Sequence, residues 1–175
     1  MLAATVTITP ETAAFDAAIE ALHEQSFGPG RFARAATRIR EEGPHDRALS
    51  LVACEGETLL GSVRMTPIMA GRGSALLLGP LAVVPAFKGC GIGRTLVHQV
   101  LERAAEHGAA LVVLVGDEPY YGPLGFSRIP YGQAVMPRPV DPDRFLAHEI
   151  VPGALQAFRG AVHHAARVAP LSRST

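Results

Sequence analysis

The segment from residue 88 to residue 95 combines residue types that bind anions. It reads Lys-Gly-Cys-Gly-Ile-Gly-Arg-Thr and follows an apolar run, Ala75–Val84, that predicts a buried strand. The apolar residues behind it recur at helical spacing: Leu96, Val97, Val100, Leu101, Ala104 and Ala105. Glycine lets the backbone approach an anion closely, and the unpaired N–H groups of a first helical turn point toward it. The segment therefore predicts an anion-binding loop, with positive charge added by Lys88 and Arg94.

Two other glycine motifs bind phosphate groups, and this sequence fits neither. Its glycines lack the Gly-x-Gly-x-x-Gly spacing of dinucleotide-binding domains, and no acidic residue stands in Gly108–Leu111, about 20 residues further on. A P-loop ends in Gly-Lys-Ser/Thr, whereas Gly93 is followed by Arg94-Thr95.

The same segment resembles motif A of the GNAT superfamily, the GCN5-related N-acetyltransferases. That motif is Gln/Arg-x-x-Gly-x-Gly/Ala after a strand that ends in a Val-x-Pro-like turn, and 83–93 fits it with Lys88 in the first position. Downstream, a predicted strand at Leu111–Val115 precedes 116–126, which resembles motif B with its Tyr-x-x-x-Gly-Phe hallmark beginning at Tyr121. Because both motifs occur in order and in register, the chain is identified as a member of this superfamily, most similar to its bacterial YhbS-like branch.

The resemblance implies an α/β (α+β) GNAT fold: a mixed central β-sheet with splayed central strands and helices on both faces. Length and composition agree with this expectation, since 175 residues suit a single domain, 1–175, and 48% hydrophobic with 18% charged residues is typical of a soluble globular protein. A formal net charge of zero without a basic cluster predicts no nucleic-acid or membrane partner. Two cysteines are too few for a disulfide framework, and without an apolar leader or long apolar run the expected location is cytoplasmic.

The remaining elements are predicted from hydrophobic spacing and turn signals. The N-terminal half should contain a strand at Val6–Ile8, a helix capped by Thr9 that buries Phe15, Ala18, Ile19 and Leu22, a helix at Phe32–Arg40, and strands at Ala48–Cys54 and Leu59–Ile68. The C-terminal third should contain a helical turn within Pro119–Gly125, short strands at Phe145–Ile150 and Gly160–Ala165, and a frayed tail at Ala169–Thr175.

The resemblance implies acetyl-CoA as the acyl donor. Its pyrophosphate would meet the N–H groups of Gly89–Arg94, and its pantetheine arm would meet free backbone groups at Leu81 and Val83. Pro80 and Pro85 are consistent with an interrupted strand ladder, and the less favoured alternative is that Pro80 marks only a bulge or an edge. The expected cofactor-binding residues are Leu81, Ala82, Val83, Lys88, Gly89, Cys90, Gly91, Ile92, Gly93, Arg94, Tyr120 and Tyr121.

The family mechanism is direct attack of a neutral amine on the thioester, which implies three roles. The backbone N–H of Val83 is the expected oxyanion donor. Tyr121 is the expected general acid for the departing thiolate, with Tyr120 as the alternative. The predicted strand 75–84 has no acid or histidine to act as the base, which leaves Glu118, followed by Asp117 and His23. Asp117 and Glu118 would also suit the cap of the short helix, and His23 would also suit an exposed helix face.

The acceptor is expected against the two N-terminal helices, the C-terminal end of the motif A strand and the proline-rich C-terminal third. It is either a small-molecule amine or an amine of a protein, and a homodimer is common in the fold. Two alternatives are an acyl-CoA sensor without turnover and a transferase for another acyl group, such as succinyl held by Arg31, Arg34 or Arg38. No metal is expected, since the adjacent His163 and His164 lack a third ligand at suitable spacing. Cys90 is more simply a passive loop residue than a redox-sensitive one.

Overall fold

A long antiparallel hairpin forms the centre of the computed structural model, which describes residues 5–167. Its strands are β3 (Thr58–Gly71) and β4 (Gly73–Val83), and the main sheet has the order β1-β2-β3-β4-β5-β8-β6. Within that order β4 and β5 run parallel and the other neighbours run antiparallel, so the predicted mixed sheet is confirmed. The remaining strands are β1 (Val6–Pro10), β2 (Leu51–Glu55), β5 (Leu111–Val115), β6 (Ser127–Arg128), β7 (Ala134–Val135), β8 (Phe145–Glu149) and β9 (Phe158–His164).

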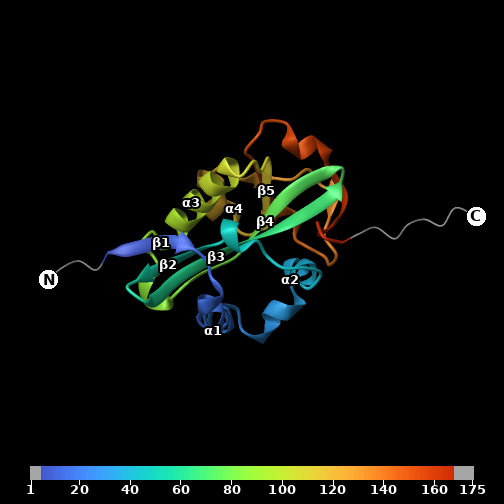
Figure 1. Cartoon of the computed structure of the whole chain (residues 1–175). Coiled ribbons are helices and arrows are strands. Elements are labelled where there is room, and N and C mark those ends of the chain that lie inside the picture. Colours follow the sequence, from blue (N-terminus) through green and yellow to red (C-terminus); the bar gives the residue numbers. More distant parts are fainter. Residues whose placement is uncertain (1–4, 168–175) are drawn as a thin grey trace, which may run out of the picture.

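Helices cover both faces of this sheet, as predicted (Figure 1). The long helix α3 (Ile92–Glu106) packs on one face over a core that includes residues of β2, β3 and β4. The short helices α1 (Asp16–Phe27) and α2 (Ala35–Arg40) lie on the opposite face. Around α2 a second core joins the sheet to the proline-rich C-terminal segment. The sheet therefore separates two hydrophobic cores.

The predicted amphipathic helix after the glycine loop is present as α3. Its buried residues are Ile92, Leu96, Val97, Val100, Leu101 and Ala104. Ala105 was expected on the same face, but it is exposed. The loop and the helix are thus anchored by one apolar stripe.

The predicted start of the first helix is wrong. Thr9 and Pro10 continue β1, where they pair with Val52 and Leu51, and α1 begins only at Asp16. Because β1 is an edge strand, a proline at its end interrupts no ladder on a second side. Within α1, Ile19 and Leu22 are buried as expected, whereas Ala18 is exposed.

The predicted second helix is shorter than expected. A 3-10 turn (Pro29–Ala33) precedes α2, and Arg34 between them is extended, with φ −73° and ψ 146°. The Thr37 hydroxyl donates to the Arg31 carbonyl across this break, at 2.6 Å. The predicted strands and the turn at α4 (Glu118–Tyr121) are present with shifted ends, and the tail Ala169–Thr175 lies outside the described residues.

A buried carboxylate that the sequence analysis did not single out joins β1 to the sheet. The Glu11 side chain has no exposed surface and accepts hydrogen bonds from Arg64, Arg47 and His45 at 2.8–3.1 Å. Burial alone would raise the pKa of Glu11, but the hydrogen bonds from His45 and Arg64 outweigh it, so this pKa lies below its ordinary value of 4.5. Glu11 therefore holds Arg64 of β3 in place.

Replacing Glu11 by glutamine is expected to lower the free energy of unfolding by about 3 kcal/mol, because removing one member of a buried ion pair leaves its partners uncompensated. Asp16→Asn is the matched control, since this carboxylate also pairs with Arg47 but is about half exposed, and its replacement should cost much less than that of Glu11. Urea unfolding measures both. The Glu11 contribution is present above pH 4.5 and is lost as the pH falls through the depressed pKa of the folded state, so the variant should be less acid-sensitive than wild type. Equal costs for the two variants would contradict this role.

Candidate functional site

The two parallel strands β4 and β5 part after a short contact. Their ladder consists of Leu76 with Val112 and Leu77 with Val113. Immediately beyond this ladder, the register between β3 and β4 shifts at Gly79 and Pro80 of β4. The parallel ladder therefore ends at a β-bulge. From there to its end at Val83, β4 is paired on the β3 side alone. This branch point is the splay that the resemblance predicts.

The backbone of β4 beyond the branch point presents free polar groups to the gap. Ala82 lies opposite Ser62, and the neighbouring Val84 N–H donates to the Leu60 carbonyl at 2.8 Å. Because hydrogen-bonded and non-hydrogen-bonded pairs alternate along an antiparallel ladder, the N–H and C=O groups of Leu81 and Val83 point away from β3. Both are therefore available to an extended ligand lying along β4.

The glycine loop closes one end of this gap. Gly91 caps α3 in the left-handed conformation, with φ +83°, and Thr95 N–H makes the first bond of the helix, to the Gly91 carbonyl. The N–H groups of residues 92–94 are left without a partner within the helix. Those of Lys88 and Cys90 bond locally instead, at 3.3 and 3.4 Å. Donors for an anion thus come from the first helical turn.

The two tyrosines of α4 face the same region. The Tyr120 hydroxyl lies so close to Gly93 that a Cβ there would be 2.7 Å away, and the Tyr121 ring covers Gly116 at the end of β5 in the same manner. Burial is the main cause that raises the pKa of Tyr121, with the neighbouring Tyr120 and Asp117 adding to it. Tyr121 therefore keeps its phenolic proton at neutral pH.

Two of the base candidates make ion pairs on the C-terminal side of the gap. Glu118 accepts from Arg128 at 2.6 Å, and Asp117 pairs with Arg144 at 3.3 Å. Asp117 stands at the cap position of α4, but its side chain makes no capping hydrogen bond. Glu118 as the base stays a prediction, and in that role its carboxylate would first have to leave Arg128.

The third base candidate lies on the opposite face of the sheet. His23 is buried rather than exposed on α1, and burial, followed by the charge of Arg64, lowers its pKa to about 4. Its Nε2 atom is buried with no hydrogen-bond partner among the described residues. His23 is therefore neutral at physiological pH and has a free ring nitrogen.

The arginines considered for a succinyl carboxylate are engaged locally. Arg31 bonds to Glu20 at 3.0 Å, Arg38 bonds to Glu41 at 3.1 Å, and Arg34 lies over the Phe27 ring. Arg40, which the sequence analysis did not single out, lies instead beside the branch point, since its Nη2 would be 3.1 Å from a Cβ at Gly79. The sequence places Arg40 at the end of a predicted helix, and nothing in that position predicts a contact with Gly79.

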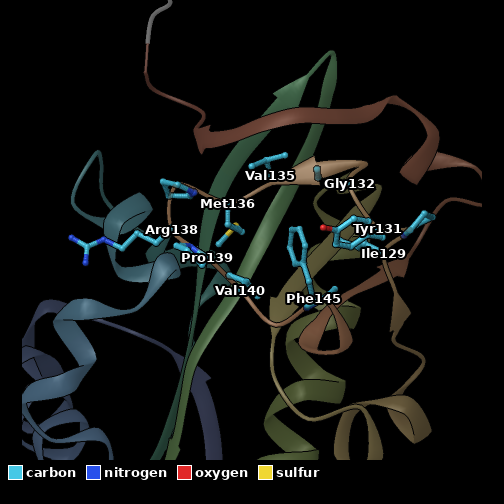
Figure 2. Close-up of a pocket in the computed structure, with 13 residues that line it drawn as sticks. Ile129, Tyr131, Gly132, Val135, Met136, Arg138, Pro139, Val140 and Phe145 are labelled. Carbon is cyan, nitrogen blue, oxygen red and sulfur yellow. The ribbon is translucent and has the colours of Figure 1, made fainter.

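Two cavities flank the region. The larger, about 400 Å³, lies within the proline-rich segment between Ile129 and Phe145, and Figure 2 shows Arg138 and Pro139 on the side where α2 lies. The smaller, about 280 Å³, lies between β1 and the start of α3, where exposed Cys90 contributes to its lining. The larger one adds an apolar surface to the face on which the acceptor was expected.

This fold and site place the chain in a known family. Residues 16–126, more than half of the sequence, match the Acetyltransferase (GNAT) family. The chain therefore belongs to the GNAT acetyltransferases, and the predicted family and fold are confirmed.

Individual relatives agree with this assignment. The uncharacterized N-acetyltransferase YhbS of Escherichia coli K12 is 30% identical over 149 residues, which cover 83% of this chain and 88% of that protein. The structure of E. coli YhbS in complex with CoA matches with a TM-score of 0.77 at 28% identity, over 93% of this chain and 91% of that one. A GNAT acetyltransferase from Brucella melitensis in complex with acetyl-CoA matches with a TM-score of 0.59 at 28% identity, over 85% and 98% of the two chains.

Two further findings concern residues 5–167, the part of the chain that the structure describes. None of the helices there has the length and apolar character needed to cross a membrane. In the same part of the chain, no group of three or more His, Cys, Asp and Glu residues is arranged to hold a metal ion.

Proposed function

We propose that this protein is an acetyl-CoA-dependent N-acetyltransferase that acetylates a primary amine by direct attack. The observation that carries the proposal is the gap between β4 and β5, which combines unpaired strand backbone with a glycine loop at a helix N-terminus. The binding of CoA or acetyl-CoA by structural relatives supports the choice of ligand.

Acetyl-CoA would lie along β4 in the place of a neighbouring strand. Its pyrophosphate would accept hydrogen bonds from the first turn of α3, with Lys88 and Arg94 nearby. Its pantetheine amides would bond to the backbone of Leu81 and Val83, as another strand would. Tyr120, whose hydroxyl reaches Gly93, would pack against this arm.

The acetyl transfer needs no covalent enzyme intermediate. The amine nitrogen forms a bond to the thioester carbonyl carbon, and the negative charge that develops on the oxygen is met by a β4 N–H group. Val83 is the predicted donor, and Leu81 faces the same way nearer the branch point. The C–S bond then breaks, the sulfur takes the phenolic proton of Tyr121, and the amine proton passes to a base.

The test is calorimetric titration of the purified protein with acetyl-CoA, followed by a thiol assay for CoA release in the presence of an amine panel. Binding together with amine-dependent release of CoA is the expected result. Binding without release for any amine would favour the sensor, and a lack of binding would overturn the proposal. Competition between acetyl-CoA, succinyl-CoA and longer acyl-CoAs would identify the donor preferred.

A further inference from the structure

Arg40 brings a positive charge to the branch point without a matching negative one. It is partly buried, its Nη2 lies against Gly79 of β4, and its Nε is buried with no hydrogen-bond partner among the residues described. Burial, followed by the charges of Arg64 and Arg34, lowers the pKa of Arg40 to about 10, so it remains a cation at neutral pH. Buried charges in proteins are normally paired, which makes this guanidinium a vacant half of an ion pair.

Two carboxylates whose charges reach His23, as that of Arg40 does, are already engaged elsewhere. Glu11 bonds to Arg64, Arg47 and His45, and Glu20 bonds to Arg31. The field at Arg40 is therefore positive and unneutralised within the described part of the chain.

Other polar atoms on the same face also lack partners within residues 5–167. These buried atoms come from α1 and β3: His23 Nε2, Ser26 Oγ, Ser62 Oγ and Thr66 Oγ1. Buried polar groups are normally hydrogen-bonded, and an orphan costs about 1–3 kcal/mol. The charge of Arg40 reaches His23 among these residues. Unpartnered polar groups and an unpaired cation on one face of the sheet suit an anionic ligand with hydrogen-bonding capacity.

We infer that Arg40 binds a carboxylate of the acceptor, so that the substrate is a small amino acid-like amine rather than a polyamine or an uncharged amine. The inference rests on the proposed acetyltransferase function and adds the chemical class of its acceptor. A polyamine would bring more positive charge to a positive site, whereas a carboxylate completes the ion pair and matches the planar guanidinium.

The position of Arg40 also limits the size of the acceptor. The Arg40 guanidinium contacts β4 at the branch point from one face of the sheet. A thioester lying in the β4–β5 gap would reach the same part of β4 from the opposite face. In an amino acid, one or a few carbons separate the amine from the carboxylate. A carboxylate on Arg40 would thus hold the amine beside the thioester, and the N-acetylated acid and free CoA would be the products.

The test compares amino acids with their carboxamides as acceptors at saturating acetyl-CoA, using glycine, β-alanine and L-phenylalanine. Each free acid is expected to have a kcat/KM at least about tenfold above that of its amide, because removing one member of a hydrogen-bonded charge pair leaves the other uncompensated. The amine of the carboxamide is less basic than that of the free acid, so a larger fraction of it is neutral and able to attack. This difference favours the carboxamide and therefore opposes the expected result. Arg40→Met should remove the preference, whereas Arg38→Met, on the exposed side of the same helix, should keep it.

A second measurement is independent of turnover. The melting temperature of the protein should rise with propionate but not with propionamide, and this difference should disappear in Arg40→Met. Equal kcat/KM for acids and amides, or a propionate effect that persists in Arg40→Met, would overturn the inference. A wild-type protein that failed to bind acetyl-CoA would instead overturn the proposed function, while the propionate response would still report on Arg40.

Discussion

Gly91→Glu is expected to weaken the binding of acetyl-CoA at least about a hundredfold. The new carboxylate would stand at the cap of α3, among the N–H groups that are free to bind the pyrophosphate, and like charges brought together there cost several kcal/mol. The experiment is calorimetric titration with acetyl-CoA, with wild type measured in parallel.

Gly91→Ala is the control that separates charge from backbone strain. Gly91 has φ +83°, and a Cβ there would meet no atom within 4 Å, so both variants carry the same strain without a clash. A side chain in the left-handed conformation costs roughly 1–2 kcal/mol of stability, which thermal unfolding would detect in both. Affinities of the two variants within about threefold of each other would show that the loop does not bind an anion.

Tyr121→Phe is expected to lower kcat by about 10²-fold or more, the usual contribution of a general acid, and to leave acetyl-CoA affinity nearly unchanged. Phenylalanine keeps the ring over Gly116 and its edge contact with Phe126, and so removes only the proton donor. Because burial raises the pKa of Tyr121, the acid stays protonated through the neutral range, and kcat should show no loss from its ionisation there. Single-turnover kinetics of CoA release measures the step directly.

Tyr120→Phe is the matched comparison, since it removes a hydroxyl from the neighbouring position of the same helix. Its hydroxyl lies at Gly93 rather than over the end of β5, so its loss is expected to change acetyl-CoA affinity more than kcat. The reverse pattern, with kcat lost in Tyr120→Phe and kept in Tyr121→Phe, would transfer the acid role to Tyr120.

The strand, glycine loop and helix proposed to bind acetyl-CoA could be predicted because their signals are local in sequence. The apolar run of β4, the glycines of the loop and the stripe of α3 are consecutive, so each position constrains the next. The same holds for the splay, where Pro80 marks the place at which the strand changes its pairing. These elements lie where the motifs indicated.

The contacts on the face proposed for the acceptor could not be predicted, because they join residues that are far apart in sequence. Glu11 reaches Arg64 across 53 positions, and Arg40 meets Gly79 through the packing of α2 on the sheet. An acidic residue after a Thr-Pro pair is typical of a helix start, and only the pairing of β1 with β2 shows it to be a buried anchor. The burial of His23 likewise depends on where α1 begins.

If acetyl-CoA binds along β4 as proposed, the persistence of the protein would depend on metabolism. A molecule that binds the folded chain and not the unfolded one adds about 2.7 kcal/mol of stability at a hundred times its Kd. With acetyl-CoA in the place of a missing strand, the empty form would open more often and meet proteases more often than the filled form. Cells short of acetyl-CoA would then lose substrate turnover and, more slowly, the polypeptide itself.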